Sequence, residues 1–347
     1  MSDRLLLDDV LSASTGELAA EVGQTVGQIA RGAIRIAQTI ADGALAGSLG
    51  AVLDDPTHGD PQTELDIRAD RLLMAALQDA PVAAFGSEES PEVLVLNAGA
   101  PLAVALDPLD GSSNIDTNVS IGTIFSIRPM SGATNGSPAS ALLQRGSSQL
   151  AAGFVIYGPR TSLVLTLGQG PQIFTLDRRR GRFVLTEADV RIPTGRREYA
   201  INASNYRHWD EAIQTYVDDC IAGVDGPHGA NFNMRWIASL VAEALRILGR
   251  GGIFLYPADR RPGYGHGRLR LVYEAHPIAL VMEQAGGAAI DGFTRILDLV
   301  PRDLHQRTPL IFGSADKVAR VARYHAGPPS TSERSPLFAR RGLFYHP

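Results

Sequence analysis

Apolar residues recur at helical spacing near the start of the chain. Over residues 17–39 they fall three or four positions apart, which predicts an amphipathic helix. A second helix is predicted over residues 64–78, with Thr63 at its start. The stretch between them, residues 43–59, is rich in glycine and other small residues and is expected to be a mobile loop.

Short apolar runs after the second helix predict buried strands. Residues 102–106 have the sequence LAVAL and end at an acidic residue, and similar runs occupy 121–127, 154–157 and 163–167. Residues 191–197 have the composition of a linker between domains. The second half then alternates strands and helices, a pattern typical of an α/β layered fold. The expected strands there are 199–203, 252–256 and 310–312, and the expected helices are 210–221, 235–248, 277–284 and 315–325.

Composition narrows the class of protein. The chain has 347 residues, of which 44 % are hydrophobic, so a globular protein of roughly two domains is expected. Its formal net charge of -5 argues against nucleic-acid binding. We find no signal peptide and no uncharged apolar run long enough for a membrane span, so a cytoplasmic protein without membrane contact is expected. Cys220 is the single cysteine, which excludes an internal disulfide.

The strongest chemical signal is the string DPLDGSSN, from Asp107 to Asn114. Asp107 follows a predicted buried strand, and Pro108 directs the chain so that Asp110 folds back beside it. Two such carboxylates repel each other unless a cation lies between them, and their oxygens suit Mg²⁺ or Mn²⁺. Gly111, Ser112 and Ser113 follow with a small backbone able to present amides to an anion. The string therefore predicts metal-assisted phosphate chemistry.

Other acids allow two interpretations each. Glu88 and Glu89 follow a predicted strand but could form a solvated surface pair. Asp66 could serve catalysis or could complete a capping box with Thr63. Glu274 precedes a predicted helix, where a carboxylate is also favoured by the helix dipole.

These strings together resemble class I fructose-1,6-bisphosphatases. The DPLDGSSN string continues into Gly122-Thr123-Ile124-Phe125, and further similar segments are 252–257 and 269–287. The likeness extends from about residue 15 to about residue 325. It implies the layered αβαβα sugar-phosphatase fold of the magnesium-dependent, lithium-sensitive phosphatases. It also implies an allosteric-type N-terminal domain at 1–192 with most metal ligands, a sugar-phosphate domain at 193–330, and a disordered tail at 331–347.

The resemblance assigns roles to particular residues. The implied metal ligands are Glu88, Asp107, Asp110, Glu274 and the Leu109 carbonyl, and the implied catalytic acids are Asp60, Asp66 and Glu89. The implied contacts to the 1-phosphate are Gly111, Ser112, Ser113 and Arg270. The implied pocket for the sugar and its 6-phosphate comprises Asn202, Tyr206, Tyr256 and Arg268. Arg235 matches an arginine that reaches into a neighbouring subunit, which implies a homo-oligomer, typically a tetramer.

The implied reaction is Mg²⁺-dependent release of the 1-phosphate of fructose 1,6-bisphosphate, a step shared by gluconeogenesis and the Calvin cycle. Sedoheptulose 1,7-bisphosphate is an alternative or additional substrate, an inositol monophosphate a more distant one, and a non-catalytic sugar-phosphate sensor a third hypothesis. Trp236 and Arg268 stand where the family usually has tyrosine and lysine. Pro101 and Pro129 replace residues of the family's nucleotide site, so weak or absent inhibition by AMP is expected.

Overall fold

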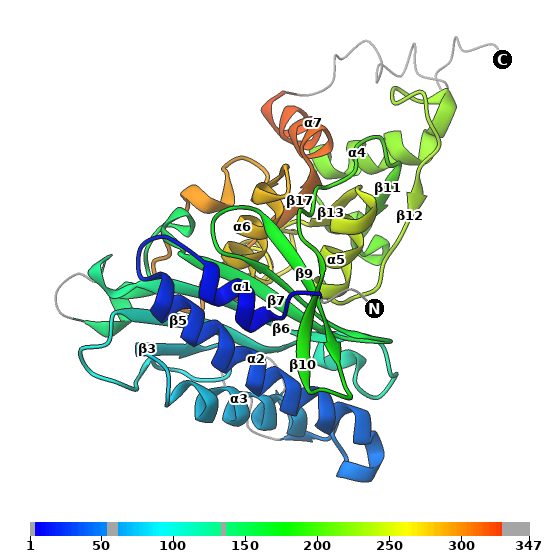
Figure 1. Ribbon diagram of the computed structural model, residues 1–347. Coiled ribbons are helices and arrows are strands. Elements are labelled where there is room, and N and C mark those ends of the chain that lie inside the picture. The colour runs from blue at the N-terminus through cyan, green and yellow to red at the C-terminus, as the bar shows by residue number, and fades with distance from the viewer. Residues whose placement is uncertain (1–3, 54–61, 133–136, 328–347) are drawn as a thin grey trace, which may run out of the picture.

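The computed structural model describes residues 4–53, 62–132 and 137–327, with two main sheets and helices on their faces (Figure 1). The helices are α1 (Leu7–Ala13), α2 (Ala19–Asp42), α3 (Glu64–Leu77), α4 (Glu211–Ala222), α5 (Leu240–Arg250), α6 (His276–Gln284) and α7 (Ala315–Ala326). A π-helical turn, η9 (Leu271–Ala275), leads directly into α6, and a short 3-10 turn, η3 (Ser112–Asn114), follows β5.

The larger sheet has the strand order β10-β9-β8-β7-β6-β5-β3-β4. Its strands are β3 (Val82–Ser87), β4 (Leu94–Val95), β5 (Leu102–Asp110), β6 (Ile121–Pro129), β7 (Ala151–Tyr157), β8 (Thr161–Thr166), β9 (Pro171–Asp177) and β10 (Arg182–Glu187). Neighbouring strands are antiparallel except β3 and β5, which are parallel. The carboxyl ends of β3 and β5 therefore meet at one edge of the sheet.

The smaller sheet has the order β12-β11-β13-β17-β15 and comes from the second half of the chain. Its strands are β11 (Glu198–Ala200), β12 (Asn233–Met234), β13 (Ile253–Tyr256), β15 (Gly287–Ile290) and β17 (Leu310–Ser314). Two further pairs join β1 (Val52–Leu53) to β2 (Gln62–Thr63) and β14 (Leu269–Arg270) to β16 (Arg307–Thr308).

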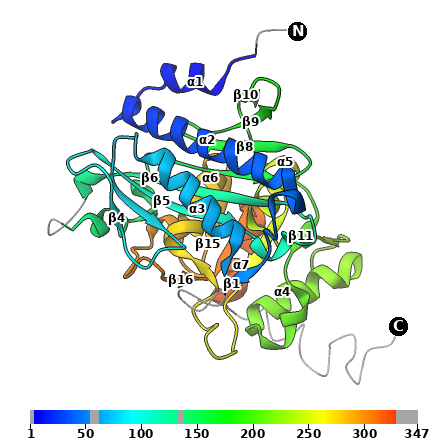
Figure 2. The same ribbon diagram turned by 90° about the horizontal axis from the view of Figure 1, so that it is seen from below.

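Apolar cores between the sheets and helices define five layers. One core joins α1, α2 and α3 to one face of the large sheet. A second joins the other face of that sheet to α5, α6 and the small sheet, and a third joins the small sheet to α4 and α7. Figures 1 and 2 show α2 and α3 side by side on one face of the large sheet, and Figure 1 shows α4 and α7 at the opposite end of the molecule. The predicted αβαβα layering is confirmed.

Most predicted elements are confirmed with small shifts of their ends. The largest error concerns α5, which was predicted to begin at Arg235 and begins at Leu240. Ala238 has a left-handed backbone (φ 61°), which no helix interior permits, and the Ser239 hydroxyl caps the helix at the Ala242 amide. The predicted strand at 199–203 is shorter, because a 3-10 turn begins at Ala203.

Several expectations lie partly or wholly outside the described residues. These are residues 54–59 of the loop predicted at 43–59, and the tail at 331–347. The division into domains at 192/193 stays a prediction. Among the described helices, none combines the length and apolar character that crossing a bilayer requires.

Two glycines of α2 give a test of its packing against α3. A Cβ atom at Gly27 would meet nothing within 4 Å, whereas one at Gly32 would lie 2.9 Å from Cδ2 of Leu73. We expect Gly27→Ala to raise Tm by about 2 °C, because alanine favours a helix interior by about 1 kcal/mol. We expect Gly32→Ala to leave Tm at or below that of wild type, because an overpacking cost of about 1–3 kcal/mol offsets the same gain in helix stability. Thermal unfolding followed by circular dichroism measures both, and an equal rise in the two variants would contradict the packing described here.

Candidate metal and phosphate site

Two parallel strands bring acidic residues to one edge of the large sheet. Ser87, the last residue of β3, pairs with Leu106 of β5. The Glu88 amide then donates to the Leu106 carbonyl oxygen at 2.9 Å. Glu88 and Glu89 consequently lie beside Asp107, rather than forming a pair on the open surface.

The end of β5 contains an irregularity that directs two aspartates to the same place. Asp107 pairs with Ile124 of β6 and Asp110 pairs with Gly122, so three steps along β5 correspond to two along β6. Such bulges change the direction of side chains. The Leu109 amide donates to Oδ1 of Asp107 at 2.9 Å, which fixes that carboxylate inside the turn.

Glu274 reaches the same place from the second half of the chain. It lies in the π-helical turn before α6, and its Oε2 accepts a hydrogen bond of 2.5 Å from the Arg270 amide. Asp107, Asp110 and Glu274 each offer one oxygen, and these oxygens lie within 4.8 Å of one another. All three side chains are buried. Three buried carboxylate oxygens at this spacing form a donor set for a hard divalent cation.

Among the described residues that line the cavity, Arg270 is the one with a positively charged side chain. Its Nε lies 3.2 Å from Oε1 of Glu88, and its guanidinium also donates to the His305 carbonyl oxygen at 3.3 Å. The cavity has a volume of about 160 Å³. Six carboxylates line it, called here the acid cluster: Asp66, Glu88, Glu89, Asp107, Asp110 and Glu274.

Burial and mutual repulsion raise the pKa values in the acid cluster. Burial, then the charges of Glu88 and Glu274, raises the pKa of Asp107 well above its usual range. Burial and the charge of Glu88 likewise raise the pKa of Glu274. Burial raises the pKa of Asp110 to about 6, even though the Val241 amide and the Ser239 hydroxyl donate to it. The protein's own hydrogen bonds therefore do not compensate these charges, and a bound cation would.

Glu89 is held by a residue that the sequence did not single out. Gln62 lines the cavity, and its amide nitrogen donates to Oε2 of Glu89 at 2.5 Å. Burial, followed by the charges of Asp66 and Glu88, raises the pKa of Glu89 to about 8. Gln62 lies one position before Thr63, which caps α3, and carries no sequence signal for its contact with Glu89, 27 residues away.

Asp66 completes the capping box that the sequence allowed, and its catalytic role stays a prediction. Its Oδ2 accepts from the Thr63 amide at 2.6 Å and from the Thr63 hydroxyl at 2.8 Å, which completes a capping box at the start of α3. The same side chain lines the cavity. Asp60 lies outside the described residues.

The backbone after Asp110 forms a tight loop beside the acid cluster. Gly111 has φ +77°, a conformation that favours glycine, and Ser112–Asn114 form a 3-10 turn. Gly111 and Ser112 line the cavity, whereas Ser113 is exposed and does not. The first amides of a helical turn have no partner within it, so this loop can present N–H groups to an anion.

The residues predicted to bind the distal phosphate lie outside this cavity. Tyr256 ends β13. Burial raises its pKa, although the charge of the nearby Arg268 guanidinium acts in the opposite direction. The Tyr206 hydroxyl donates to Asp218 at 2.9 Å. The Asn202 side-chain oxygen accepts from the Ser204 amide at 3.2 Å. Arg235 is half exposed, with Nε 3.7 Å from Glu198.

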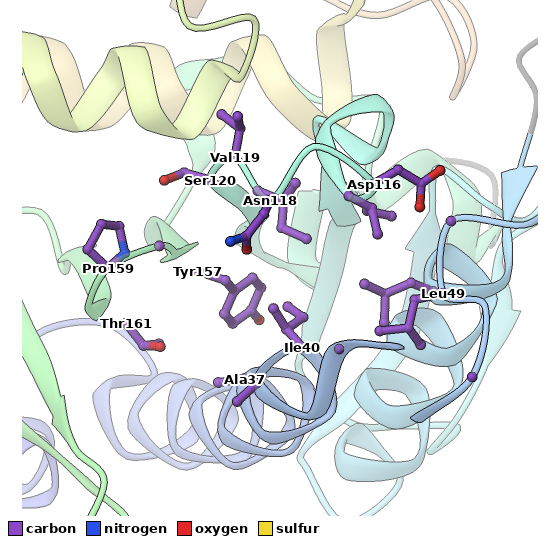
Figure 3. A pocket seen from close by; sticks show the side chains of 18 of the residues that line it. Ala37, Ile40, Leu49, Asp116, Asn118, Val119, Ser120, Tyr157, Pro159 and Thr161 are labelled. Atoms are coloured by element: carbon purple, nitrogen blue, oxygen red, sulfur yellow. The ribbon is translucent and has the colours of Figure 1, made fainter. Parts of the chain in front are cut away.

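A larger cavity of about 1100 Å³ lies between the end of α2 and the loop after η3 (Figure 3). Its wall includes Ile40, Leu49, Asp116 and Tyr157. Among the described residues that line this cavity, one is acidic, the exposed Asp116. A single exposed carboxylate gives this cavity no comparable metal-binding chemistry, so the smaller cavity is the candidate site.

Comparison with known proteins agrees with this architecture. The chain matches the family "Fructose-1-6-bisphosphatase, N-terminal domain" over residues 6–188 and "Fructose-1-6-bisphosphatase, C-terminal domain" over residues 192–326. The class 1 fructose-1,6-bisphosphatase of Rhodopseudomonas palustris (strain TIE-1) is 55 % identical over 324 residues, 93 % of each chain. The protein of that name from Sinorhizobium medicae is 55 % identical over 329 residues, 94 % of each chain.

This chain belongs to the fructose-1,6-bisphosphatase family. The holo crystal structure of the Leishmania major fructose-1,6-bisphosphatase is similar, with a TM-score of 0.86 and 33 % identity, covering 93 % of this chain and 99 % of that one. The resemblance inferred from the sequence motifs is thereby confirmed, and metal dependence is a property of this family.

The raised pKa values predict how stability depends on pH without metal. A folded-state pKa above the unfolded value means that the folded protein binds more protons, so stability falls as pH rises. The window extends from about pH 4.3, the ordinary glutamate pKa, up to the value of about 8 for Glu89. We expect Tm of metal-free protein to fall between pH 5 and pH 8, and added MgCl₂ to raise Tm by at least about 3 °C at pH 8 but little at pH 5. A metal effect independent of pH would contradict the assignment.

Proposed function

We propose that the chain is a metal-dependent phosphatase that hydrolyses the 1-phosphate of D-fructose 1,6-bisphosphate, giving fructose 6-phosphate and inorganic phosphate. The observation that carries this proposal is the acid cluster, which shares one cavity with the Gly111 loop in a chain of this family. Hydrolysis of a phosphate monoester is very slow without catalysis, so the site must lower a high barrier.

The donor set favours Mg²⁺, with Mn²⁺ as a substitute. The proposed ligands are the carboxylates of Glu88, Asp107, Asp110 and Glu274 together with the Leu109 carbonyl oxygen. All are hard oxygen donors, and three of the carboxylates already converge. A bound metal would polarise the phosphoryl oxygens and lower the pKa of an attacking water.

Glu89 is the proposed base that takes the proton of the attacking water. Its carboxylate lines the cavity beside the proposed metal ligands, within reach of a water bound there, and Gln62 fixes its orientation. Asp66 is the proposed second acid, although its Oδ2 is already engaged in the cap of α3. A role for Asp60 stays a prediction from sequence.

The loop after Asp110 is the proposed cradle for the phosphate that leaves the sugar. The amides of Gly111 and Ser112, which line the cavity, would donate to its oxygens together with the Ser113 amide that follows, and the buried Arg270 would add positive charge. Held in this geometry, the groups would keep the phosphorus in line with the attacking water.

The distal phosphate would anchor the other end of the sugar. The proposed contacts are Asn202, Tyr206, Tyr256 and Arg268. An anchor of this kind orients the reacting phosphate, and its binding energy can assist catalysis at the other end of the substrate. Arg235 is half exposed, as its proposed role toward a neighbouring subunit requires, and we propose a homotetramer that acts in the cytoplasm.

Sedoheptulose 1,7-bisphosphate is a second candidate substrate. The Trp236 ring lies 5.9 Å from Phe254 and 6.0 Å from Tyr256, where it forms an aromatic wall near the proposed distal pocket. Tryptophan differs in size from the tyrosine usual in the family, so the length of sugar that this pocket accepts is open to measurement. The complete acid cluster disfavours a non-catalytic sensor.

The proposed reaction is tested by phosphate release from a panel of sugar phosphates with and without Mg²⁺. We expect fructose 1,6-bisphosphate to have the highest kcat/KM, with no release in EDTA. Asp107→Asn should lower kcat at least about 10³-fold, because it removes a metal ligand from a buried site. The matched control is Asp116→Asn, an exposed aspartate outside the acid cluster, which should retain activity within about twofold. Equal activity of the two variants would refute the proposed site.

A further inference from the structure

The segment 235–239, between β12 and α5, is called here the strap. It connects the proposed distal pocket to a proposed metal ligand. Trp236, near its beginning, packs against Phe254 and Tyr256. At its other end the Ser239 hydroxyl donates to Oδ2 of Asp110 at 3.2 Å, and the Val241 amide donates to the same oxygen at 3.0 Å.

The strap also contacts the proposed phosphate cradle. The Asn114 side-chain amide donates to the Ala238 carbonyl oxygen at 2.8 Å. A Cβ atom at Gly111 would lie 3.3 Å from Cβ of Ser239, so the cradle and the strap are in close contact. A displacement of the strap therefore moves donors to Asp110 and the support of the cradle together.

A set of ionic contacts, called here the ionic ring, ties the strap to the small sheet. Glu198 lies 3.7 Å from Arg235 and 3.0 Å from Arg246. Arg246 binds Glu243 at 2.8 Å, and Oε1 of Glu243 accepts from the Ile237 amide at 2.8 Å. The ionic contacts thus begin at Arg235 of the strap and return to the strap at Ile237. Glu198, Glu243 and Arg246 are largely buried, so the contacts among these three are little screened by solvent, whereas the Arg235 side chain is half exposed.

Ala238 lies between these attachments in a conformation that alanine rarely adopts. Its φ of +61° is in the left-handed region, where a Cβ atom is unfavourable. Such a conformation persists only where surrounding contacts over-determine it, and it is often found at functional sites. Here Asn114 holds the Ala238 carbonyl oxygen and Glu243 holds the Ile237 amide. The next residue, Ser239, is held by its hydrogen bond to Asp110.

We propose that the strap couples occupation of the distal pocket to the position of Asp110 and of the phosphate cradle. This inference rests on the proposed function. Contact of the substrate's distal end with the wall that includes Trp236 would hold the strap, and Ser239 would then hold Asp110 in its productive place. Ser239, Ala238 and Glu243 are in this sense positioning residues. A substrate without a distal phosphate would lose catalytic rate as well as affinity.

The coupling is tested by comparing fructose 1,6-bisphosphate with fructose 1-phosphate, which lacks the distal phosphate. The quantity measured is the ratio of kcat/KM for the two substrates. Ala238→Gly removes the strain and loosens the strap, so we expect that ratio to fall at least about fivefold, with the loss in kcat for the bisphosphate. We expect Tm to stay equal or rise, because glycine accepts this backbone. A damaged fold would instead lower Tm and slow both substrates alike.

Two further variants complete the test. Asn118→Gly is the matched control, since Asn118 is also left-handed (φ +56°), is exposed, and lies outside the strap; its ratio should equal that of wild type. Glu243→Gln weakens the ionic ring and should lower the ratio in the same direction as Ala238→Gly. An unchanged ratio in Ala238→Gly would overturn the coupling while leaving the proposed phosphatase intact. Absence of phosphate release from either substrate by wild type would instead overturn the proposed function.

Discussion

Mutual repulsion among buried carboxylates is the constraint on which this site depends. Six carboxylates and one guanidinium line a cavity of about 160 Å³, so full ionisation would leave a net charge of −5 there. Charges of one sign at such spacing are costly in a low-dielectric interior. The fold offers several members of the acid cluster a donor: the Leu109 amide for Asp107, the Val241 amide for Asp110 and the Arg270 amide for Glu274. The pKa values of all three remain raised, so a bound multivalent cation would relieve the repulsion that these donors leave.

The sheet and its irregularities explain how such a cluster can form. β3 and β5 are buried along their whole length, so their ends are fixed in space. The parallel pairing of these two strands brings Glu88 beside Asp107, and the irregularity in β5 adds Asp110. The π-helical turn then directs Glu274 inward from the other half of the chain. Departures from regular structure thus occur where chemistry needs side chains to converge.

Features with a local sequence signal could be predicted. The apolar run 102–106 predicted a buried strand before Asp107, although β5 continues to Asp110, and Thr63 with Asp66 predicted a helix cap. The start of α5 was predicted wrongly. Apolar spacing placed it at Arg235, whereas the helix begins after Ser239, a residue type typical of a helix cap. Gln62 had no local signal, because its contact with Glu89 spans 27 residues of sequence.

The contact between Asp110 and α5 could not be predicted, and it joins the two halves of the chain. The Val241 amide and the Asp110 carboxylate are separated by 131 residues of sequence. A carboxylate at a helix N-terminus is stabilised by the free amides of that helix. The same aspartate belongs to the converging oxygen set, so one side chain serves both helix capping and the proposed metal site. Any movement of α5 relative to the large sheet must therefore alter the oxygen set, which makes the packing of the two halves part of the site's chemistry.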